Sequence, residues 1–178
     1  MTTSRREFCL LPGLLVAAGA PTLDVDARLI EMLGRPVEAP QPIGDYVPAR
    51  RVAGLVFLST TPAKRGARIM FPGVVGRDLD LAAGIIAAQW AALTLLEYLF
   101  IELGGTLSAV KQFVSLTGYV SSEEGFHQQA EVMNGATRVL TGIFGAERGR
   151  PTRSSIGVRH MPRNASVAVS GIVEINRL

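Results

Sequence analysis

Residues 81–103, LAAGIIAAQWAALTLLEYLFIEL, form the longest apolar stretch of the chain. Two aspartates precede the stretch and Gly104-Gly105 follow it, which is typical of a helix with an acidic start and a glycine stop. Its length would suit a membrane span, but Gln89, Glu97 and Glu102 interrupt it and no cationic flank follows. The sequence therefore predicts a buried helix, covered by a sheet on one side and by further protein, such as a neighbouring subunit, on another.

Strands and two other helices are predicted on either side of this segment. Apolar residues at helical spacing that end at a glycine indicate helices, and β-favouring runs between turn residues indicate strands. Four prolines between 36 and 48 predict an extended connection. The predicted elements are a short helix over 24–34, strands over 52–60 and 67–75, the helix over 81–103, a strand over 111–120, a helix over 123–144, and strands over 153–158 and 165–175.

This order predicts an α+β domain whose β-sheet carries both long helices on one face. No predicted helix remains to cover the opposite face of the sheet. Oligomerisation is the simplest way to cover it, so the pattern also predicts that copies of the chain associate.

Composition excludes several classes of protein. With 178 residues, of which 48% are hydrophobic and 19% charged, the chain is long and apolar enough for one folded domain. A single cysteine, Cys9, and two distant histidines, His127 and His160, exclude a disulfide framework and a Cys/His metal site. Sixteen of the 18 cationic residues are arginine, but they are scattered and the net charge is only +3, so no nucleic-acid-binding arm is predicted.

The first twenty residues are predicted to lie outside the folded domain. SRREF at 4–8, followed by a mildly apolar stretch to Ala20, resembles a twin-arginine export signal. About 11 apolar residues are too few for a stable membrane anchor. Cleavage after Ala20 or Ala27 would remove Cys9 and leave a periplasmic protein without a thiol; the alternative is an ordinary N-terminus on a cytoplasmic protein. We assign 1–20 to the signal, 21–40 to an N-terminal extension with a short helix, and 41–178 to the domain.

Five short motifs in the domain occur in an order that resembles a known family. They are IGDYVP (43–48), LVFLS (55–59), LTGYV (116–120), VMNGA (132–136) and RSSIGV (153–158) with Met161-Pro162. Together they resemble the RidA/YjgF family, also labelled endoribonuclease L-PSP, and in particular its subgroup with Asn-Gly-Ala and Arg-Ser-x-x-Gly-Val motifs. The resemblance covers about residues 41–175.

The resemblance implies a chorismate-mutase-like fold with a mixed sheet, a homotrimer, and a ligand cleft at each subunit interface. The best-understood members hydrolyse reactive enamines and imines to a keto acid and ammonia, without a cofactor or metal. The resemblance therefore implies a small carboxylated metabolite as ligand. We expect no cofactor, no nucleic-acid partner and no membrane anchor.

Six residues are candidates for binding the ligand: Arg153, Tyr46, Ser59, Thr60, Asn134 and Ser155. Arg153 matches the arginine that binds the substrate carboxylate, a role suited to the planar guanidinium. Tyr46 matches an aromatic residue lining the cleft, and Ser155 lies where many members have cysteine, either to donate to the ligand or to face the core. Asn134 either touches a neighbour's cleft or serves its own helix, where Gly135 permits a close helix approach.

Two departures from the family concern catalysis and cleft shape. Ser59 and Thr60 occupy a turn in which the family has a glycine after the serine, so Thr60 should reshape the cleft wall. Active deaminases have a glutamate where Ala168 stands here, often with a second at Ser170, and general acid–base help of ~10²–10⁴-fold would be missing without it. The sequence thus leaves two functions open: an enamine/imine deaminase, or a non-catalytic carboxylate-binding trimer. Ribonuclease activity is not expected, because the sequence has no pair of neighbouring histidines, no basic stripe and no stacking aromatics.

Overall fold

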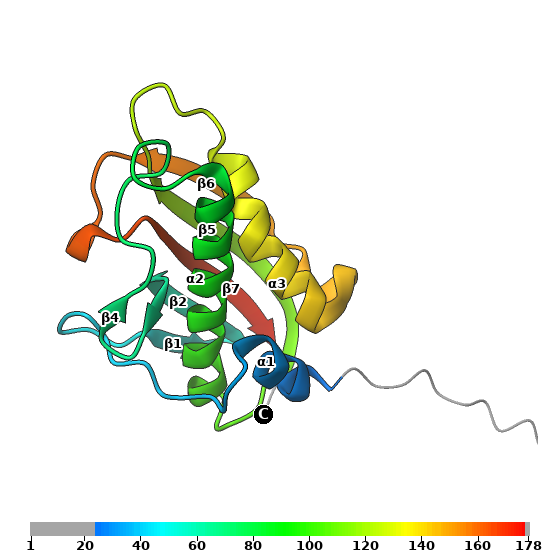
Figure 1. Ribbon diagram of the computed structural model, residues 1–178. Coiled ribbons are helices and arrows are strands. Elements are labelled where there is room, and N and C mark those ends of the chain that lie inside the picture. Colours follow the sequence, from blue (N-terminus) through cyan, green and yellow to red (C-terminus); the bar gives the residue numbers. More distant parts are fainter. Residues whose placement is uncertain (1–23, 177–178) are drawn as a thin grey trace, which may run out of the picture.

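The computed structural model describes residues 24–176 of the chain (Figure 1). The predicted signal segment 1–20 and the first candidate cleavage site lie outside these residues. The elements are α1 (Val25–Leu33), β1 (Ala49–Val52), β2 (Leu55–Pro62), β3 (Lys64–Arg65), β4 (Arg68–Ile69), α2 (Leu81–Glu102), β5 (Val110–Ser121), α3 (Gln129–Gly149), β6 (Thr152–Val158), a 3₁₀ turn η1 (Pro162–Asn164) and β7 (Val167–Ile175).

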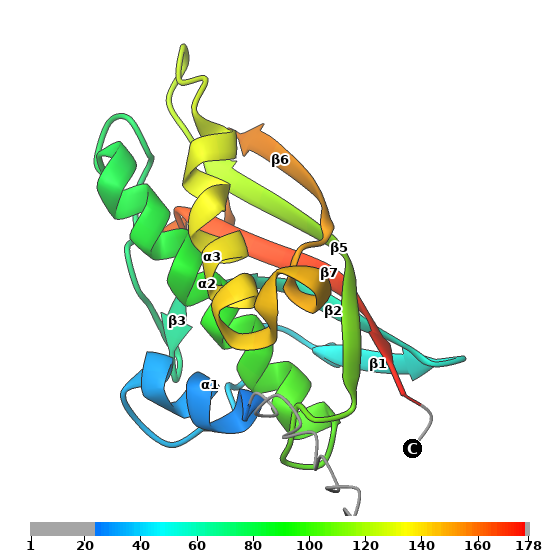
Figure 2. The ribbon, with the colours of Figure 1, turned by 90° about the vertical axis from the view of Figure 1, so that its right-hand side faces the viewer.

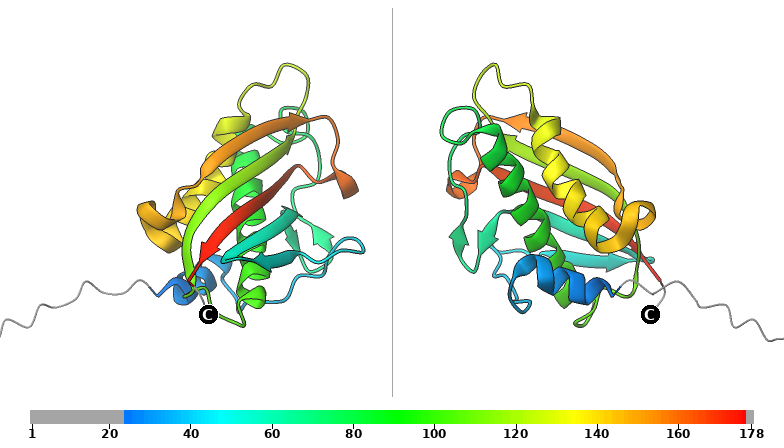
Figure 3. Two further views of the ribbon diagram at one scale, coloured as in Figure 1. Left: turned by 180° about the vertical axis from the view of Figure 1, so that it is seen from behind. Right: turned by 45° about the vertical axis from the view of Figure 1, so that its right-hand side comes forward.

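The main sheet has five strands in the order β1-β2-β7-β5-β6. All neighbouring pairs are antiparallel except β5 and β6, which run parallel because α3 carries the chain back between them. Helices α2 and α3 pack side by side on one face of this sheet (Figures 2 and 3). The predicted α+β fold, with a mixed sheet and both long helices on one face, is confirmed.

Helix α2 occupies the centre of the hydrophobic core. The Asp80 side chain caps its first turn by accepting a 2.7 Å hydrogen bond from the backbone N–H of Ala83, and Gly104 follows its end with φ +82°. Side chains such as Leu95, Leu96 and Leu99 are fully buried against the sheet and α3. Among the described residues α2 alone is long and apolar enough to cross a membrane, but most of it lies inside the protein, as predicted for a core helix.

Helix α3 approaches its neighbours closely at two glycines. A Cβ on Gly135 would lie 2.2 Å from the backbone carbonyl oxygen of Ile85 on α2. On the sheet side, a Cβ on Gly118 of β5 would lie 2.1 Å from the Met133 sulfur. The close helix approach predicted at Gly135 is therefore confirmed, since any side chain there would force the helices apart.

Helix α1 ties the start of the described chain to the rest of the domain. Leu29 and Leu33 are buried in the common core, and Gly34 ends the helix in the left-handed conformation. Asp26 accepts hydrogen bonds from the Thr106 hydroxyl (2.6 Å) and the Leu107 backbone N–H (2.7 Å), beyond the end of α2. The short helix predicted over 24–34 is thus present.

The first predicted strand, 52–60, was wrong in its boundaries. A two-residue turn at Ala53-Gly54, both with positive φ, separates β1 from β2 and makes them a hairpin. Residues 67–75 form no strand of the main sheet. Instead β3 and β4 make a separate two-stranded ribbon, and the left-handed backbone of Phe71 and Gly73 (φ +54° and +125°) breaks any longer pairing.

The helix predicted over 123–144 also differs at both ends. Residues 123–128 form a loop that includes Gly125 at φ +83°, and α3 begins only at Gln129. Gly145 leaves helical geometry (φ +79°), as its predicted stop position requires, but another helical turn follows before the chain enters β6. A 2.5 Å hydrogen bond from the Arg148 guanidinium to the Val110 carbonyl holds this additional turn against the start of β5.

The sheet face opposite the helices is not covered by any helix of the described chain (Figure 3, left). We call it the open face; it includes Phe57 paired with Ile172, and Tyr119 paired with Ile156. Phe57, on the inner strand β2, and Ile156, on the edge strand β6, are 43% and 42% exposed and leave apolar surface on this face. Association between copies was predicted because no helix was left to cover this face of the sheet, and the described chain indeed has no helix there (Figure 3).

Candidate functional site

Four of the six predicted site residues lie in two separate places. Arg153 and Asn134 meet where β6 passes α3, whereas Tyr46 and Thr60 line a cavity at the other end of β6. In the pairing of β5 with β6, Arg153 lies opposite Leu116, whose side chain is buried under the helices. The Arg153 side chain therefore lies on the face of the sheet that carries the helices, at the edge strand β6. A single chain therefore does not bring the predicted site residues together.

Three hydrogen bonds fix the Arg153 guanidinium against α3. Its Nη1 donates to Oδ1 of Asn134 (3.0 Å) and to Oγ1 of Thr137 (2.9 Å), and its Nη2 donates to the backbone carbonyl of Ala130 (3.1 Å). A guanidinium has five N–H donors, so Nε and one Nη2 hydrogen have no partner within residues 24–176. The side chain is half-buried. This is an oriented cation with donors left for a carboxylate.

The second place is a cavity of about 430 Å³, which we call the Tyr46 pocket. The Tyr46 and Thr60 side chains border it at the exposed end, and the buried Ala168 methyl contributes to its inner wall. None of the described residues that line it is Asp or Glu. The complete lining is Ile43, Gly44, Tyr46, Thr60, Pro62, Tyr119, Val158, His160, Met161, Pro162, Ala165 and Ala168.

The two predicted serines contact neither group directly. Ser59 is half-buried on β2, next to Thr60 but not among the residues that line the Tyr46 pocket, and its backbone N–H donates to the Pro48 carbonyl (2.9 Å). Ser155 is half-buried on β6 opposite Gly118, two residues beyond Arg153 and hence on the same side of the strand. Ser155 thus lies nearer to Arg153 than to the pocket.

Sequence reasoning missed several residues of both places. Thr137 follows Asn134 by three residues, and this helical spacing could have indicated that both face the same neighbour. His160, which is not among the predicted site residues, is exposed and also borders the Tyr46 pocket. Beside it, Arg163 and Asn164 have left-handed backbone (φ +55° and +58°), which is uncommon for non-glycine residues and often found near functional sites.

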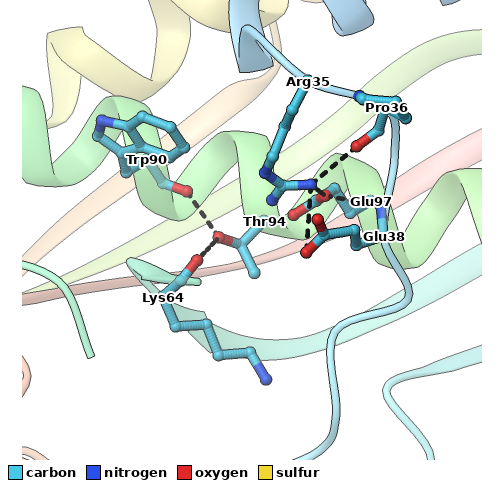
Figure 4. A network of polar contacts seen from close by, with 7 residues as sticks. All are labelled: Arg35, Pro36, Glu38, Lys64, Trp90, Thr94 and Glu97. Atoms are coloured by element: carbon cyan, nitrogen blue, oxygen red, sulfur yellow. Dashed lines mark hydrogen bonds and ion pairs between the residues drawn. The ribbon is translucent and has the colours of Figure 1, made fainter. Parts of the chain in front are cut away.

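A buried ionic network anchors the segment 35–48, which carries Tyr46 (Figure 4). The Arg35 guanidinium pairs with the Glu97 carboxylate on α2 at 2.8 Å, and their side chains are only 10% and 3% exposed. The same carboxylate accepts a 3.2 Å hydrogen bond from the backbone N–H of Glu38. Charges this deeply buried are tolerated only with such partners, so the network fixes where the segment crosses α2.

Lys64 holds the same segment a few residues further on. Its buried ammonium donates to the Tyr98 hydroxyl (2.7 Å) and to the backbone carbonyl of Gln41, which also accepts a 3.1 Å hydrogen bond from Tyr98. Burial, with a smaller contribution from the nearby Arg163 charge, lowers the pKa of Lys64. Since Ile43, Gly44 and Tyr46 follow directly, this contact positions one wall of the Tyr46 pocket.

We expect Tyr98 to make stability depend on pH in the alkaline range. Burial raises the pKa of Tyr98 to about 12, with smaller contributions from Tyr46 and Glu97. This value lies above the pKa of an unfolded tyrosine, ~10, so the protonated Tyr98 side chain contributes to the free energy of unfolding. That contribution is complete below pH ~10 and is lost as the pH rises toward 12. The lowered pKa of Lys64 acts in the opposite direction, so the wild type must be compared with Tyr98→Phe.

Urea unfolding midpoints between pH 9 and 11.5 measure this effect. The wild type should lose stability more steeply with rising pH than Tyr98→Phe does. Parallel curves for the two proteins would contradict the assignment.

No group of three or more potential metal ligands occurs within residues 24–176. What the site offers is an oriented guanidinium, an apolar pocket with hydroxyl and imidazole groups at its mouth, and an open sheet face. This fold, a mixed sheet with the parallel helices α2 and α3 side by side on one face and no helix of the described chain on the other (Figure 3), is that of chorismate-mutase-like α+β proteins.

Comparison with solved structures identifies the family within this class. Protein Atu1372 from Agrobacterium tumefaciens, whose function is unknown, is 33% identical, with a TM-score of 0.78 over 85% of this chain and 92% of that one. A candidate endoribonuclease from Shewanella oneidensis is 25% identical, with a TM-score of 0.77 over 85% and 99% of the two chains. The E. coli YjgF gene product shares the fold at 20% identity, with a TM-score of 0.53 over 78% and 94%. The chain belongs to the YjgF/RidA family, also known as the L-PSP endoribonuclease family.

One curated protein is also similar in sequence. Protein TCP17 of Trypanosoma cruzi is 36% identical over 104 residues, which is 58% of this chain. The match spans 64% of the length of that protein. No protein-family profile matches the sequence.

Proposed function

We propose that this protein is an enamine/imine deaminase that hydrolyses small carboxylated substrates, with Arg153 as the carboxylate anchor. The observation that carries the proposal is the arrangement of the Arg153 guanidinium. It is held by Asn134, Thr137 and Ala130 and retains two donors at a half-buried position. A cation oriented in advance binds a carboxylate without first losing side-chain freedom.

We further propose that the working site lies between subunits of a homotrimer. Arg153 and the Tyr46 pocket are at opposite ends of β6, so they can act on one small molecule only if they come from different copies. The open face, with Phe57 and Ile156 exposed, offers apolar surface for such association. Cyclic association would place the start of β6 of one subunit near the pocket of the next.

The proposed reaction needs little from the protein. The enamine tautomerises to the imine, water adds to the carbon of the C=N bond, and collapse of the adduct releases ammonia and leaves the C=O of a 2-oxo acid. The Tyr46 and Thr60 hydroxyls and the His160 imidazole are the groups at the pocket mouth that can hold the water and exchange protons. The substrate carboxylate stays on Arg153 throughout.

A second function is favoured by one observation. Ala168 lines the Tyr46 pocket where the family resemblance expects a glutamate, and no other described lining residue is acidic. Without a carboxylate the pocket lacks a strong proton relay, which would suit a trimer that binds a small carboxylate without converting it.

Removing the guanidinium tests the anchor. Freshly generated 2-aminoacrylate is mixed with the purified full-length protein, and ammonia release and carboxylate binding are measured. Losing charge-assisted hydrogen bonds of ~1.5–3 kcal/mol should weaken carboxylate binding roughly 10–100-fold in Arg153→Ala. Arg150→Ala is the matched control, since Arg150 is exposed and makes no side-chain hydrogen bond to another described residue.

The two functions predict different results. Ammonia release above the buffer rate, lost in Arg153→Ala and kept in Arg150→Ala, supports the deaminase. No release, together with carboxylate binding that depends on Arg153, supports the binding protein. Equal behaviour of both variants and the wild type would exclude Arg153 as the anchor.

A further inference from the structure

The Tyr46 pocket is larger and more apolar than a three-carbon substrate requires. Cavities of ~300–1,000 Å³ accommodate drug-sized ligands, and this one measures about 430 Å³. Most of its lining is aliphatic or proline, and its polar groups are limited to two tyrosines, Thr60, His160 and the backbone. An acid as small as 2-aminoacrylate would leave much of the cavity filled only by water.

The inner wall is built across three neighbouring strands. In the sheet register Ala168 on β7 stands opposite Pro62 on β2 and opposite Tyr119 on β5, and all three line the cavity. Pro62, Ala165 and Ala168 are buried. A proline ring, a tyrosine ring and two methyl groups at this position provide an apolar surface and no charged group. The small Ala168 side chain also leaves the space that a longer residue would fill.

Three of the four polar side chains of the pocket lie at its mouth, whereas Tyr119 belongs to the inner wall. Tyr46, Thr60 and His160 are exposed, in contrast to the buried inner wall. Arg159 and Arg163 flank His160 in the chain, so the neighbourhood of the mouth is cationic. The mouth is also shaped in advance: the Asn164 carbonyl accepts a 2.9 Å hydrogen bond from the Gly73 backbone N–H, and Arg163 and Asn164 hold left-handed backbone. An amphipathic ligand would therefore enter with its apolar end inward and its anionic end toward the mouth.

We propose that the Tyr46 pocket selects carboxylates with a bulky apolar side chain, branched or aromatic, over three- and four-carbon acids. The proposal rests on the proposed function, because it assigns the substrate class of that same site. Each methylene buried in an apolar pocket strengthens binding about fourfold. A phenyl group in place of a hydrogen should therefore strengthen binding by roughly 100-fold or more.

Stable 2-oxo acids, the products of imine hydrolysis, serve as probes. Dissociation constants of pyruvate, 4-methyl-2-oxopentanoate and phenylpyruvate are measured by calorimetry on the full-length protein in its native assembly. We expect phenylpyruvate to bind at least 30-fold more tightly than pyruvate, with 4-methyl-2-oxopentanoate between them. Pyruvate binding within threefold of phenylpyruvate would overturn the proposal.

Filling the pocket provides the matched test. Ala168→Phe should weaken phenylpyruvate binding at least tenfold and change pyruvate binding less than threefold. Ala146→Phe places the same side chain at an exposed position of α3 and should change neither constant. If Ala168→Phe unfolds the protein, as judged by its thermal transition, Ala168→Val replaces it with a smaller expected loss. Phenylpyruvate binding that is unchanged in a folded Ala168 variant would also overturn the proposal.

Arg153→Ala separates this inference from the proposed function. If Arg153→Ala binds all three acids more weakly but the wild type binds them without a size preference, the anchor stands and the pocket preference is wrong. If the size preference is present but Arg153→Ala leaves all three constants unchanged, the preference stands and the proposed anchor is wrong. If none of the acids binds, both are wrong.

Discussion

Replacing Glu97 with alanine is expected to destabilise the protein by about 3–5 kcal/mol, the typical effect of removing one partner of a buried ion pair. The Arg35 guanidinium would remain buried without its carboxylate, and its Nε already has no hydrogen-bond partner among the described residues. The Glu38 backbone N–H would lose its acceptor at the same time. Chemical unfolding of the wild type and Glu97→Ala measures the difference.

A double variant tests whether the loss comes from the unpaired charge. Arg35→Met combined with Glu97→Met removes both charges and keeps apolar volume, so it should be clearly more stable than Glu97→Ala. Glu38→Ala is a control, because it removes an exposed carboxylate 3.7 Å from Arg35 and leaves the Glu38 backbone N–H in place. Its effect should stay below about 1 kcal/mol. A Glu97→Ala variant as stable as Glu38→Ala would show that the network does not stabilise the fold.

Replacing Gly135 with alanine should destabilise the protein by roughly 3 kcal/mol, at the upper end of the range for overpacked cores. The new methyl group would lie 2.2 Å from a backbone carbonyl of α2, and backbone cannot move aside as the end of a flexible side chain can. The helices must separate, which exposes core side chains. The thermal midpoint should fall by roughly 6–12 °C for a chain of this size.

Gly142 provides the matched control on the same helix. A Cβ there would meet only the terminal methyl group of Met32, at 2.6 Å, and that flexible side chain can rotate away. Because alanine favours helix over glycine by ~1 kcal/mol, Gly142→Ala should be neutral or stabilising. Equal thermal midpoints for the two alanine variants would show that the α2–α3 contact is not limited by Gly135.

Much of the fold could be predicted because the core elements have strong local signals. Residues 81–103 combine continuous apolarity with glycines at the end, and the observed helix Leu81–Glu102 agrees within one residue. The boundary errors came from weak signals. Ala53-Gly54 is not among the common hairpin pairs, yet the chain turns there because β1 and β2 pair with each other. The start of α3 was placed early because the preceding loop contains residues that are acceptable in a helix.

The candidate site was less predictable than the fold. Motif order identified Arg153 and Tyr46 individually, but their separation depends on the strand register and on which face of the sheet each side chain takes. The partner Thr137 and the pocket wall at Tyr119 and Ala168 also result from tertiary pairing. The anchoring of Tyr46 through Arg35, Glu97 and Lys64 joins three distant segments and has no local signature.

The sequence by itself determined the class of fold, the family and the absence of a carboxylate at position 168, because periodicity, glycine placement and motif order are local properties of the chain. Only the tertiary structure decided that Arg153 is fixed on α3, away from the Tyr46 pocket, and that Ala168 faces that pocket opposite Tyr119. The physical reason is that hydrogen-bond geometry and cavity shape depend on contacts between residues far apart in sequence. A pattern along the chain restricts such contacts without fixing which atoms meet.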